Sequence, residues 1–348
     1  MKGNEAIAEA ALRAGCQAFF GYPITPQSEI LEYLAREMPV RGGVILQAES
    51  EIAAMNMVMG ASASGGRVMT STSGPGFCLK LEALSVMTLT RLPAVIVLIQ
   101  RSGPGFGTMK ASQEDYRMNG SGGYRTVILA PSTIQEAADM TFEAFDIADQ
   151  YRNPVIVMGD AIIGQMMEGV DFDRMPAPRE NLPEKEWALH GSSARGGKPY
   201  FHYVAEGRTH YEEKYYAETE LYPTIIRNET RVEIVDVENA DIVLTAYGTA
   251  ARMCRSIMAL GVENIKLGLI RPKTLWPFPY EAFDRIGSEC KAVLCPEINT
   301  IGQMIDDVRI AAKGRWPVVH VGDTAEDFLQ PQGIEHAVKT LWEELRNK

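Results

Sequence analysis

Two carboxylates, Glu49 and Glu51, stand where an apolar run meets a run rich in Ala and Met, within residues 42–60. The apolar run at 44–46 predicts a short buried strand, and the second run predicts a helix with Ser50 as its N-cap residue. Glu51 would then lie in the first helical turn at the carboxyl edge of a sheet, where open α/β folds bind ligands. The alternative is that Glu51 only complements the helix dipole.

The pentapeptide SGPGF occurs twice, at residues 73–77 and again at 102–106 directly after Arg101. Backbone N–H groups of a glycine-rich turn before a helix can hold an anion. Glycines also permit tight strand-to-helix turns with positive φ, which is the structural alternative. Neither copy matches a nucleotide-binding fingerprint. We therefore favour close approach of the backbone to a ligand over phosphate binding.

These residues need a sheet to position them, and the first 170 residues alternate between helical and strand patterns. This alternation predicts a doubly wound, parallel α/β sheet with crossover helices. Thr25 followed by Pro26 predicts a helix start with Thr25 as N-cap. The predicted helices cover 4–14, 26 onward, 50 onward, 79–89 and 134–149, and the predicted strands cover 17–22, 44–46, 67–72, 93–100, 125–129 and 154–158.

Residues 171–232 differ from the preceding segment in residue pattern. They contain a run of Tyr and His at 200–216 and show little periodicity. We expect an extended connecting arm whose aromatic side chains pack on a neighbouring subunit or on the chain itself. Regular patterns resume over 233–348 and predict a second, smaller α/β domain with about half the strands of the first. Its predicted strands are 241–247, 265–270, 291–295 and 318–321.

Whole-chain properties narrow the classes of function. A net charge of −11 argues against a nucleic-acid partner and against an anionic membrane surface. Residues 1–16 contain Glu and Arg and do not resemble a signal peptide, and no apolar run is long enough to span a bilayer. The five cysteines are odd in number and lack C-x-x-C spacing, so no disulfide framework, iron–sulfur cluster or metal site is indicated. We expect a cytoplasmic protein.

Three features together resemble the α subunit of the 2-oxoacid:ferredoxin oxidoreductases: GYPITP at 21–26, QAESE at 47–51, and Arg101 at a strand end. The resemblance covers essentially the whole chain, including the arm and the segment RPKTLWPFP at 271–279. It implies a pyrimidine-binding domain of the thiamine diphosphate type. It also implies that the second domain is like the carboxy-terminal domain of transketolase.

The resemblance also implies roles for individual residues. Glu51 matches the catalytic glutamate that contacts the aminopyrimidine ring of thiamine diphosphate, and Thr25 and Arg101 match residues that meet the carboxylate of the 2-oxoacid. A β subunit would hold the diphosphate, Mg²⁺ and a [4Fe–4S] cluster, with γ and ferredoxin-like δ subunits, coenzyme A as co-substrate and ferredoxin as electron acceptor. The residues expected to border the cofactor are Tyr22, Pro23, Ile24, Glu51, Ser73 and Gly74.

The residue types suit this chemistry. A carboxyl group on the pyrimidine nitrogen favours the imino tautomer, in which the cofactor's own amino group acts as base. The acid must hold or share a proton near neutral pH, which calls for burial, and we expect that burial at a subunit interface. Arg101 offers a planar fork for a carboxylate. Thr25 offers a hydroxyl, although helix capping would compete for the same oxygen.

The expected 2-oxoacid depends on the loop 103–107, whose sequence resembles that of the branched-chain members of the family more than that of the 2-oxoglutarate members. Phe106 and Met109 suit an apolar side chain, so we expect 2-oxoisovalerate. The alternative is 2-oxoglutarate, for which Lys110 or Arg117 would supply a second positive charge. Other classes are a non-redox thiamine enzyme of the transketolase or acetolactate type, a structural subunit without catalytic residues, and a stand-alone binder of small acids.

Overall fold

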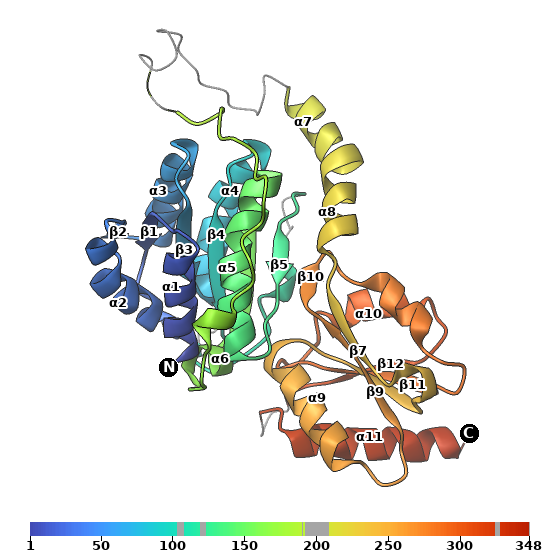
Figure 1. Cartoon of the computed structure of the whole chain (residues 1–348). Coiled ribbons are helices and arrows are strands. Elements are labelled where there is room, and N and C mark those ends of the chain that lie inside the picture. The colour runs from blue at the N-terminus through green and yellow to red at the C-terminus, as the bar shows by residue number, and fades with distance from the viewer. Residues whose placement is uncertain (103–107, 119–122, 190, 192–208, 324–327, 348) are drawn as a thin grey trace.

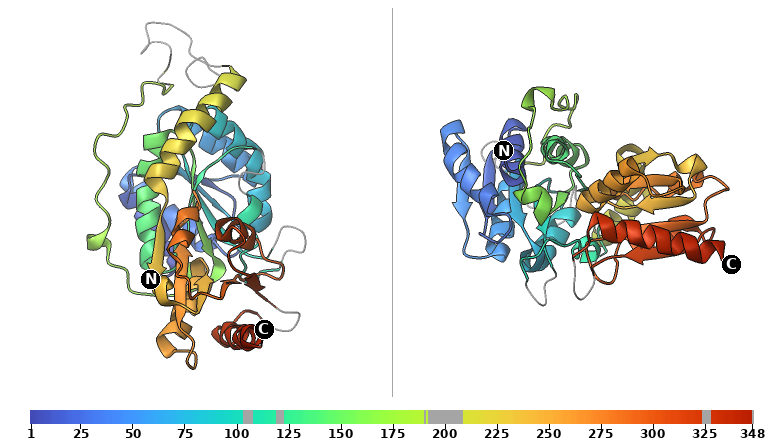
Figure 2. Two further views of the ribbon diagram at one scale, coloured as in Figure 1. Left: turned by 90° about the vertical axis from the view of Figure 1, so that its right-hand side faces the viewer. Right: turned by 90° about the horizontal axis from the view of Figure 1, so that it is seen from below.

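The computed structural model of the chain describes residues 1–102, 108–118, 123–189, 191, 209–323 and 328–347. Two mixed α/β domains lie side by side, each built on one sheet (Figures 1 and 2). The described residues form one sheet of seven strands and another of five. None of the described helices is both long and apolar enough to cross a membrane.

The first sheet runs in the order β10-β5-β6-β4-β3-β1-β2, and all of its neighbouring strands are parallel except β10, which is antiparallel to β5. This confirms the predicted doubly wound domain. Its strands are β1 (Ala18–Gly21), β2 (Val44–Gln47), β3 (Val68–Thr72), β4 (Val95–Gln100), β5 (Val127–Leu129), β6 (Val155–Asp160) and β10 (Thr274–Trp276). Its helices are α1 (Gly3–Arg13), α2 (Ser28–Glu37), α3 (Glu51–Ala63), α4 (Gly74–Leu89), α5 (Ile134–Tyr151) and α6 (Ala161–Gln165).

Strand β4 shows why the sheet is covered on both faces. Its residues Val95 to Ile99 are all buried, and they alternate between two cores. Helices α1, α2 and α5 supply one core, while α3 and α4 supply the other. A strand packed on both faces reads as a continuous apolar run, as the sequence showed.

The prediction of a buried strand at 44–46 was correct for the strand but wrong for its burial. Strand β2 pairs only with β1, at the edge of the sheet. Val44 is 56% exposed, and Leu46 is exposed as well. Because an edge strand has one neighbour and is covered less on its faces, a short apolar run does not guarantee burial.

The second sheet runs in the order β12-β11-β8-β9-β7. Strand β7 is antiparallel to β9 and escaped prediction, as did β10 in the first sheet. With five strands against seven, the second sheet has more than the expected half of the strands of the first. The strands are β7 (Val232–Val235), β8 (Ile242–Thr245), β9 (Leu267–Pro272), β11 (Ala292–Pro296) and β12 (Val318–Val321), and the helices are α9 (Gly248–Leu260), α10 (Ile305–Ala312) and α11 (Pro331–Arg346).

The C-terminal part of the predicted arm is helical. Helix α7 (His210–Tyr216), a π-helical turn (Ala217–Leu221) and α8 (Tyr222–Glu229) follow one another and lead toward the second domain (Figure 1). Thr209 and Glu212 form a capping box at the start of α7. Leu221, Tyr222 and Ile225 belong to the hydrophobic core of the first domain, and the ring of Tyr222 packs against that of Trp276, so this part of the segment folds onto its own chain.

Ion pairs and strand pairing join the two domains. Arg271 of β9 is fully buried and reaches Glu136 of α5, with 2.7 Å between Nη2 and Oε1. Asp160 at the end of β6 accepts hydrogen bonds from the backbone and hydroxyl of Thr249 in α9. Together with the β5–β10 pairing, these contacts fix the second domain against the first.

Candidate active site

The predicted site residues gather at the carboxyl edge of four adjacent strands, in the order β4-β3-β1-β2. Thr25 follows β1, Glu51 opens α3 after β2, Gly74 opens α4 after β3, and Arg101 follows β4. Because parallel strands end at the same edge, four segments far apart in sequence converge there.

Glu51 is the first residue of α3, and the cap of this helix fixes its position. The hydroxyl of Ser50 accepts a hydrogen bond from the N–H of Ala53 at 3.2 Å, which confirms the predicted cap. The side chain of Glu51 is buried, with 5% exposed. It is buried within this chain already, before any partner is bound.

The first SGPGF segment packs directly against Glu51. It is not a loop before a helix at 79, as expected, because α4 begins at Gly74. A Cβ atom on Gly76 would lie 2.3 Å from Oε1 of Glu51 and 2.3 Å from Oγ1 of Thr72. Gly76 thus lets the first turn of α4 pass close to the carboxylate, and Gly74 has the positive φ (39°) that the turn explanation required. The second SGPGF segment lies mostly outside the described residues.

A lysine that sequence analysis missed lies beside Glu51. Lys80 of α4 is fully buried, and its Nζ donates to Oγ1 of Thr70 at 3.0 Å and to the main-chain carbonyl of Glu51 at 3.4 Å. Burial lowers the pKa of Lys80 to about 8, although the charge of Glu51 opposes this shift. The first turn of α3 is therefore placed next to a cation that has lost most of its water.

The segment 22–26 forms an anchored turn, and the predicted helix start at Thr25 and Pro26 was wrong. The carbonyl of Pro26 accepts hydrogen bonds from Asn4 at 2.7 Å and from Gln165 at 2.8 Å, and helix α2 begins only at Ser28. These side chains come from α1 and α6, so tertiary contacts override the local capping signal. Thr25 is exposed and does not cap the helix, which removes the competition for its hydroxyl.

Arg101 and a second unpredicted residue, Asp115, meet at Gly74. A Cβ atom on Gly74 would lie 3.6 Å from Nε of Arg101, and the N–H of Gly74 donates to Oδ2 of Asp115 at 3.2 Å. Asp115 is fully buried and Arg101 is 9% exposed. Burial raises the pKa of Asp115 to about 7, while the N–H of Gly74 and the charge of Arg101 act in the opposite direction.

Several buried polar atoms near these residues have no hydrogen-bond partner in the described part of the chain. Native proteins pair the great majority of such atoms, so a group of them at one sheet edge indicates a place where a ligand binds. They are Oγ1 of Thr72, Oγ of Ser73, Nε2 of Gln100, Nε of Arg101, Oγ of Ser112 and Oδ1 of Asp115.

The residues expected to select the 2-oxoacid are only partly described. Phe106 lies outside the described residues, and Met109 is exposed. The backbone N–H of Ser102 donates to the carbonyl of Lys110, which brings Lys110 back beside Arg101. Arg117 instead forms an ion pair with Asp306 of the second domain, so its guanidinium is turned away from this role.

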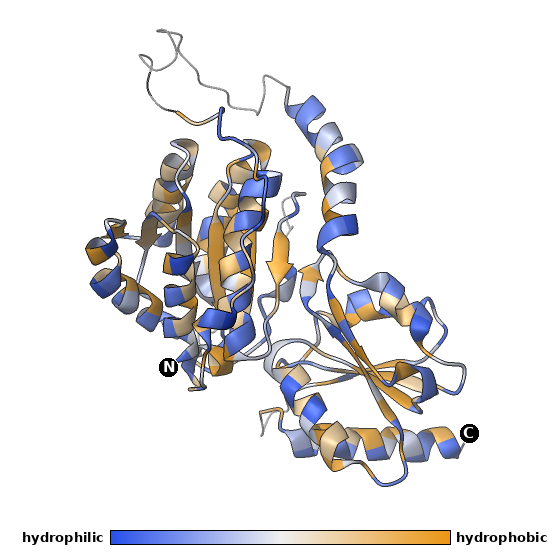
Figure 3. Ribbon diagram, viewed as in Figure 1, coloured by the Kyte–Doolittle hydropathy of each residue, from blue (hydrophilic) through white to orange (hydrophobic). Residues whose placement is uncertain are grey.

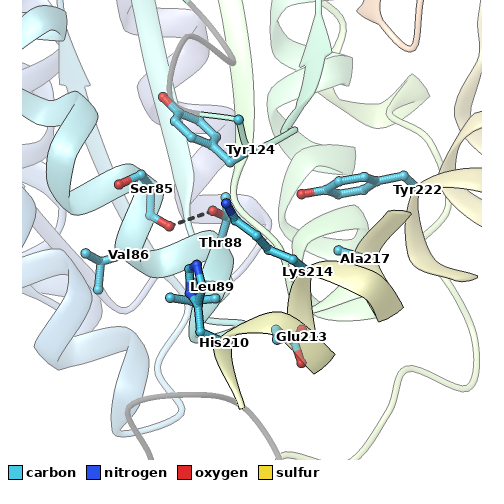
Figure 4. A pocket seen from close by; sticks show the side chains of 11 residues that line it. Ser85, Val86, Thr88, Leu89, Tyr124, His210, Glu213, Lys214, Ala217 and Tyr222 are labelled. Carbon is cyan, nitrogen blue, oxygen red and sulfur yellow. Dashed lines mark hydrogen bonds between the residues drawn. The ribbon is translucent and has the colours of Figure 1, made fainter. Parts of the chain in front are cut away.

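The cavity drawn in Figure 4 lies elsewhere. Its volume is about 210 Å³, and it is bounded by Ser85 and Leu89 of α4 and by His210 and Lys214 of α7. None of the predicted site residues lines it. This cavity adjoins the C-terminal half of α4, whereas the candidate site adjoins the N-terminal end.

The outer faces of α3 and α4 are apolar beside the site. Ile52 is 53% exposed and Leu79 is 48% exposed. Both helices carry few hydrophilic residues, while α11 alternates between the two kinds (Figure 3). Exposed apolar surface around a buried carboxylate is typical of a site that a second protein completes.

A buried acid, polar atoms without partners in the described chain and an apolar rim lie together at the carboxyl edge of a doubly wound sheet, where folds of this class bind ligands. The family comparisons agree with this class. Residues 9–236 match the family "pyruvate flavodoxin/ferredoxin oxidoreductase, thiamine diP-bdg", and residues 240–331 match "pyruvate:ferredoxin oxidoreductase core domain II". The chain belongs to the 2-oxoacid:ferredoxin oxidoreductase family, as its sequence motifs indicated.

Two relatives in this family are subunits of enzymes for different 2-oxoacids. The ketoisovalerate oxidoreductase subunit VorB of Methanothermobacter marburgensis is 42% identical, over 90% of this chain and 89% of its own length. The 2-oxoglutarate synthase subunit KorA of Methanocaldococcus jannaschii is 36% identical, over 97% of this chain and 98% of its own. Both relatives are named as subunits, so this chain is one component of an oxidoreductase complex.

Two solved structures share the fold. The 2-oxoglutarate:ferredoxin oxidoreductase of Magnetococcus marinus, solved with 2-oxoglutarate, coenzyme A and succinyl-CoA, has a TM-score of 0.81 and 27% identity; the match covers 99% of this chain and 65% of that one. A split-gene transketolase, described as an inactive β4 tetramer, has a TM-score of 0.61 and 16% identity, with 98% and 97% covered. The second match confirms the transketolase-like arrangement of the two domains.

Proposed function

We propose that this chain is the α subunit of a thiamine diphosphate-dependent enzyme that decarboxylates a 2-oxoacid, transfers the acyl group to coenzyme A and reduces ferredoxin. The observation that carries the proposal is the placement of Glu51. It is a buried acid at the start of α3, and polar atoms without partners in the described chain and an apolar rim lie at the same edge of the sheet.

The residues present fit the pyrimidine half of the cofactor. Gly76 lets the first turn of α4 pack against the carboxylate of Glu51, and the exposed side chains of Tyr22 and Ile52 offer apolar surface to an aromatic ring. Thiamine diphosphate, when bound, supplies the carbanion chemistry of decarboxylation. In this proposal Glu51 holds a proton in a hydrogen bond to the pyrimidine nitrogen, and the turn at 22–24 together with Ser73 and Gly74 orients the ring.

In this proposal Arg101 and Thr25 bind the substrate. Arg101 emerges from β4 with Nε unpaired, and its guanidinium can bind a carboxylate through two parallel hydrogen bonds. Thr25 adds an exposed hydroxyl from the neighbouring segment after β1. A β subunit would cover the outer faces of α3 and α4 and would hold the diphosphate, Mg²⁺ and a [4Fe–4S] cluster. Subunits of the γ and ferredoxin-like δ types would complete the complex in the cytoplasm.

We propose 2-oxoisovalerate as the preferred substrate. The identity to VorB is higher than to KorA, and Arg117, one candidate for a second carboxylate, is paired with Asp306. The second candidate substrate is 2-oxoglutarate. Lys110 could supply the positive charge for its second carboxylate, because the backbone of Lys110 lies beside Arg101.

The test is a substrate panel on the native complex, purified through a tag on this chain. We expect coenzyme A-dependent reduction of a viologen dye, with kcat/KM highest for 2-oxoisovalerate. A higher value for 2-oxoglutarate would select the second candidate. A complex without iron–sulfur absorbance would favour a non-redox thiamine enzyme, and a complex that reduces nothing with any 2-oxoacid would refute the proposal.

A further inference from the structure

Asp115 occupies a place in the site that none of the proposed roles explains. It follows the segment after β4 and is fully buried. Oδ2 accepts the N–H of Gly74, its own N–H donates to Oε1 of Gln100, and Oδ1 has no partner among the described residues. An unpaired carboxylate oxygen in a buried site is costly unless a proton or a ligand satisfies it.

Charged and titratable groups from three parts of the chain interact with Asp115. Arg101 lies on the other side of Gly74 and favours the charged form of Asp115, while Glu114 opposes it. From α4, the thiol of Cys78 has its pKa raised first by burial and then by the charge of Asp115. From the second domain, Tyr247 has its pKa raised in part by the same charge. Arg101 is thus the favourable counter-charge of Asp115 in this cluster.

We propose that Asp115 balances the charge of Arg101 while the site is empty and takes up a proton when the carboxylate of the substrate replaces it. This inference rests on the proposed function of Arg101. Arg101 and Asp115 both lie against Gly74, and a substrate carboxylate bound at Arg101 would place a second negative charge near Asp115, which favours protonation of Asp115. Asp115 would then be a positioning residue that couples substrate binding to proton uptake.

The proton balance is simple. The proton comes from solvent when the 2-oxoacid binds, and it enters on Oδ1 of Asp115, because Oδ2 already accepts the N–H of Gly74. When the substrate loses its carboxylate as CO₂, Arg101 regains Asp115 as its counter-charge and the proton returns to solvent. No net proton is consumed over the cycle by this residue.

The coupling predicts a pH dependence of binding. Below pH 7, Asp115 is already protonated in the empty site, so the KM for the 2-oxoacid should be flat with pH. Above about pH 7, each binding event must draw a proton, so this KM should rise up to tenfold per pH unit. The KM for coenzyme A, which does not meet Arg101, should not follow the same slope.

The experiment compares the native complex carrying the wild-type chain with the Asp115→Asn variant. The amide oxygen of Asn can still accept from Gly74, but the side chain cannot titrate. We expect the KM for the 2-oxoacid to rise about fivefold from pH 7 to pH 8 in the wild type, because Asp115 is half protonated at pH 7, and to stay level in the variant. Asp139→Asn is the matched control, because Asp139 also has a pKa raised by burial but lies on α5, away from the site. That control should keep the wild-type slope.

A calorimetric measurement keeps the proposal testable if the variant fails to assemble. Binding of an unreactive 2-oxoacid analogue to the wild-type complex at pH 8, in buffers of different ionisation enthalpy, should show uptake of close to one proton. An uptake near zero, or an unchanged slope in Asp115→Asn, would overturn the inference. A complex that oxidises a 2-oxoacid but lacks the coupling refutes only the role of Asp115. A complex that oxidises none refutes the proposed function itself.

Discussion

Glu51 in the first sheet and Glu297 in the second stand at comparable places, each after a strand and near the start of the next helix. Their surroundings differ. Glu297 is fully buried, and its carboxylate accepts the N–H groups of Gln303, Met304 and Ile305 at 2.9–3.0 Å and the side-chain amide of Asn299 at 3.0 Å. The carboxylate of Glu297 therefore works as a support for the start of α10.

The cluster around Glu51 has the opposite character. It contains a buried lysine with one hydroxyl and one carbonyl as acceptors, a glycine that lets α4 pack against the carboxylate of Glu51, and neighbouring polar atoms that lack partners in the described chain. Hydrogen bonds left unmade at a buried site reduce stability. The difference teaches that a saturated carboxylate supports the fold, while an unsaturated cluster at the same kind of position is available to a ligand.

Removal of the Glu51 carboxyl group should have the largest effect on activity. In a complex assembled with Glu51→Ala, we expect turnover of the 2-oxoacid to fall about 10²–10⁴-fold, which is the usual contribution of a positioned acid or base. The complex should still assemble, because the carboxylate of Glu51 is not what holds α3 in place. The measurements are kcat by dye reduction and subunit content by size-exclusion chromatography. Near-normal turnover would refute the catalytic role.

Removal of the Glu297 carboxyl group should have a large effect on stability instead. Glu297→Ala leaves three backbone donors at and just before the start of α10 without their acceptor, and each buried donor left unpaired costs about 1–3 kcal/mol. We expect the free energy of unfolding, measured by urea titration, to fall by about 3 kcal/mol or more. Glu281→Ala, an exposed glutamate of the same domain, is the control and should change it by less than about 0.5 kcal/mol. Equal stability of the two variants would contradict the structural role of Glu297, and with it the contrast to Glu51.

The sequence predicted the parts of this contrast that depend on local patterns. Ser50 caps α3 through a contact three residues away, and strand ends in a parallel sheet meet at one edge whatever their separation in sequence. The false cap at Thr25 arose because Asn4 and Gln165, which anchor Pro26, are distant in sequence. The helices of the arm, which were not predicted, have one local signal in the sequence, the capping box of Thr209 and Glu212.

The other misses had no local signal. Asp115 lies just before a short 3-10 turn (Tyr116–Met118) in the connection between β4 and β5, and only the fold brings it to Gly74. Strand β10 is a short stretch of the second domain that pairs with the first sheet, and its partner β5 is far away in sequence. Lys80 looks like an ordinary charged residue on a helix until the fold buries it. Contacts of this kind depend on tertiary structure, which single-sequence patterns do not encode.

Removal of the Arg101 guanidinium should give a moderate, substrate-specific effect. Hydrogen bonds to charged groups contribute about 1.5–3 kcal/mol, so Arg101→Ala should raise the KM for the 2-oxoacid about 10–100-fold and leave the KM for coenzyme A nearly unchanged. Arg101→Lys keeps the charge but loses the planar fork and should give an intermediate value. A parallel rise in both KM values would mean that Arg101 supports the site as a whole, as Glu297 supports α10.

The smallest effect is expected for replacement of Lys80. It tests whether the cluster around Glu51 lowers the stability of the chain. The pKa of Lys80 falls from 10.5 to about 8 on folding, so from pH 8 to 10.5 the unfolded chain binds more protons at this residue than the folded chain. Stability from this residue therefore rises with pH in that window, by about 1.4 kcal/mol per unit. Lys80→Met fills a similar volume without a charge and should be more stable than the wild type at pH 7. Its advantage in urea unfolding should shrink by about 1.4 kcal/mol at pH 9. If the two chains keep the same difference at both pH values, the amine is not desolvated, and the cluster around Glu51 would be as well satisfied as the one around Glu297.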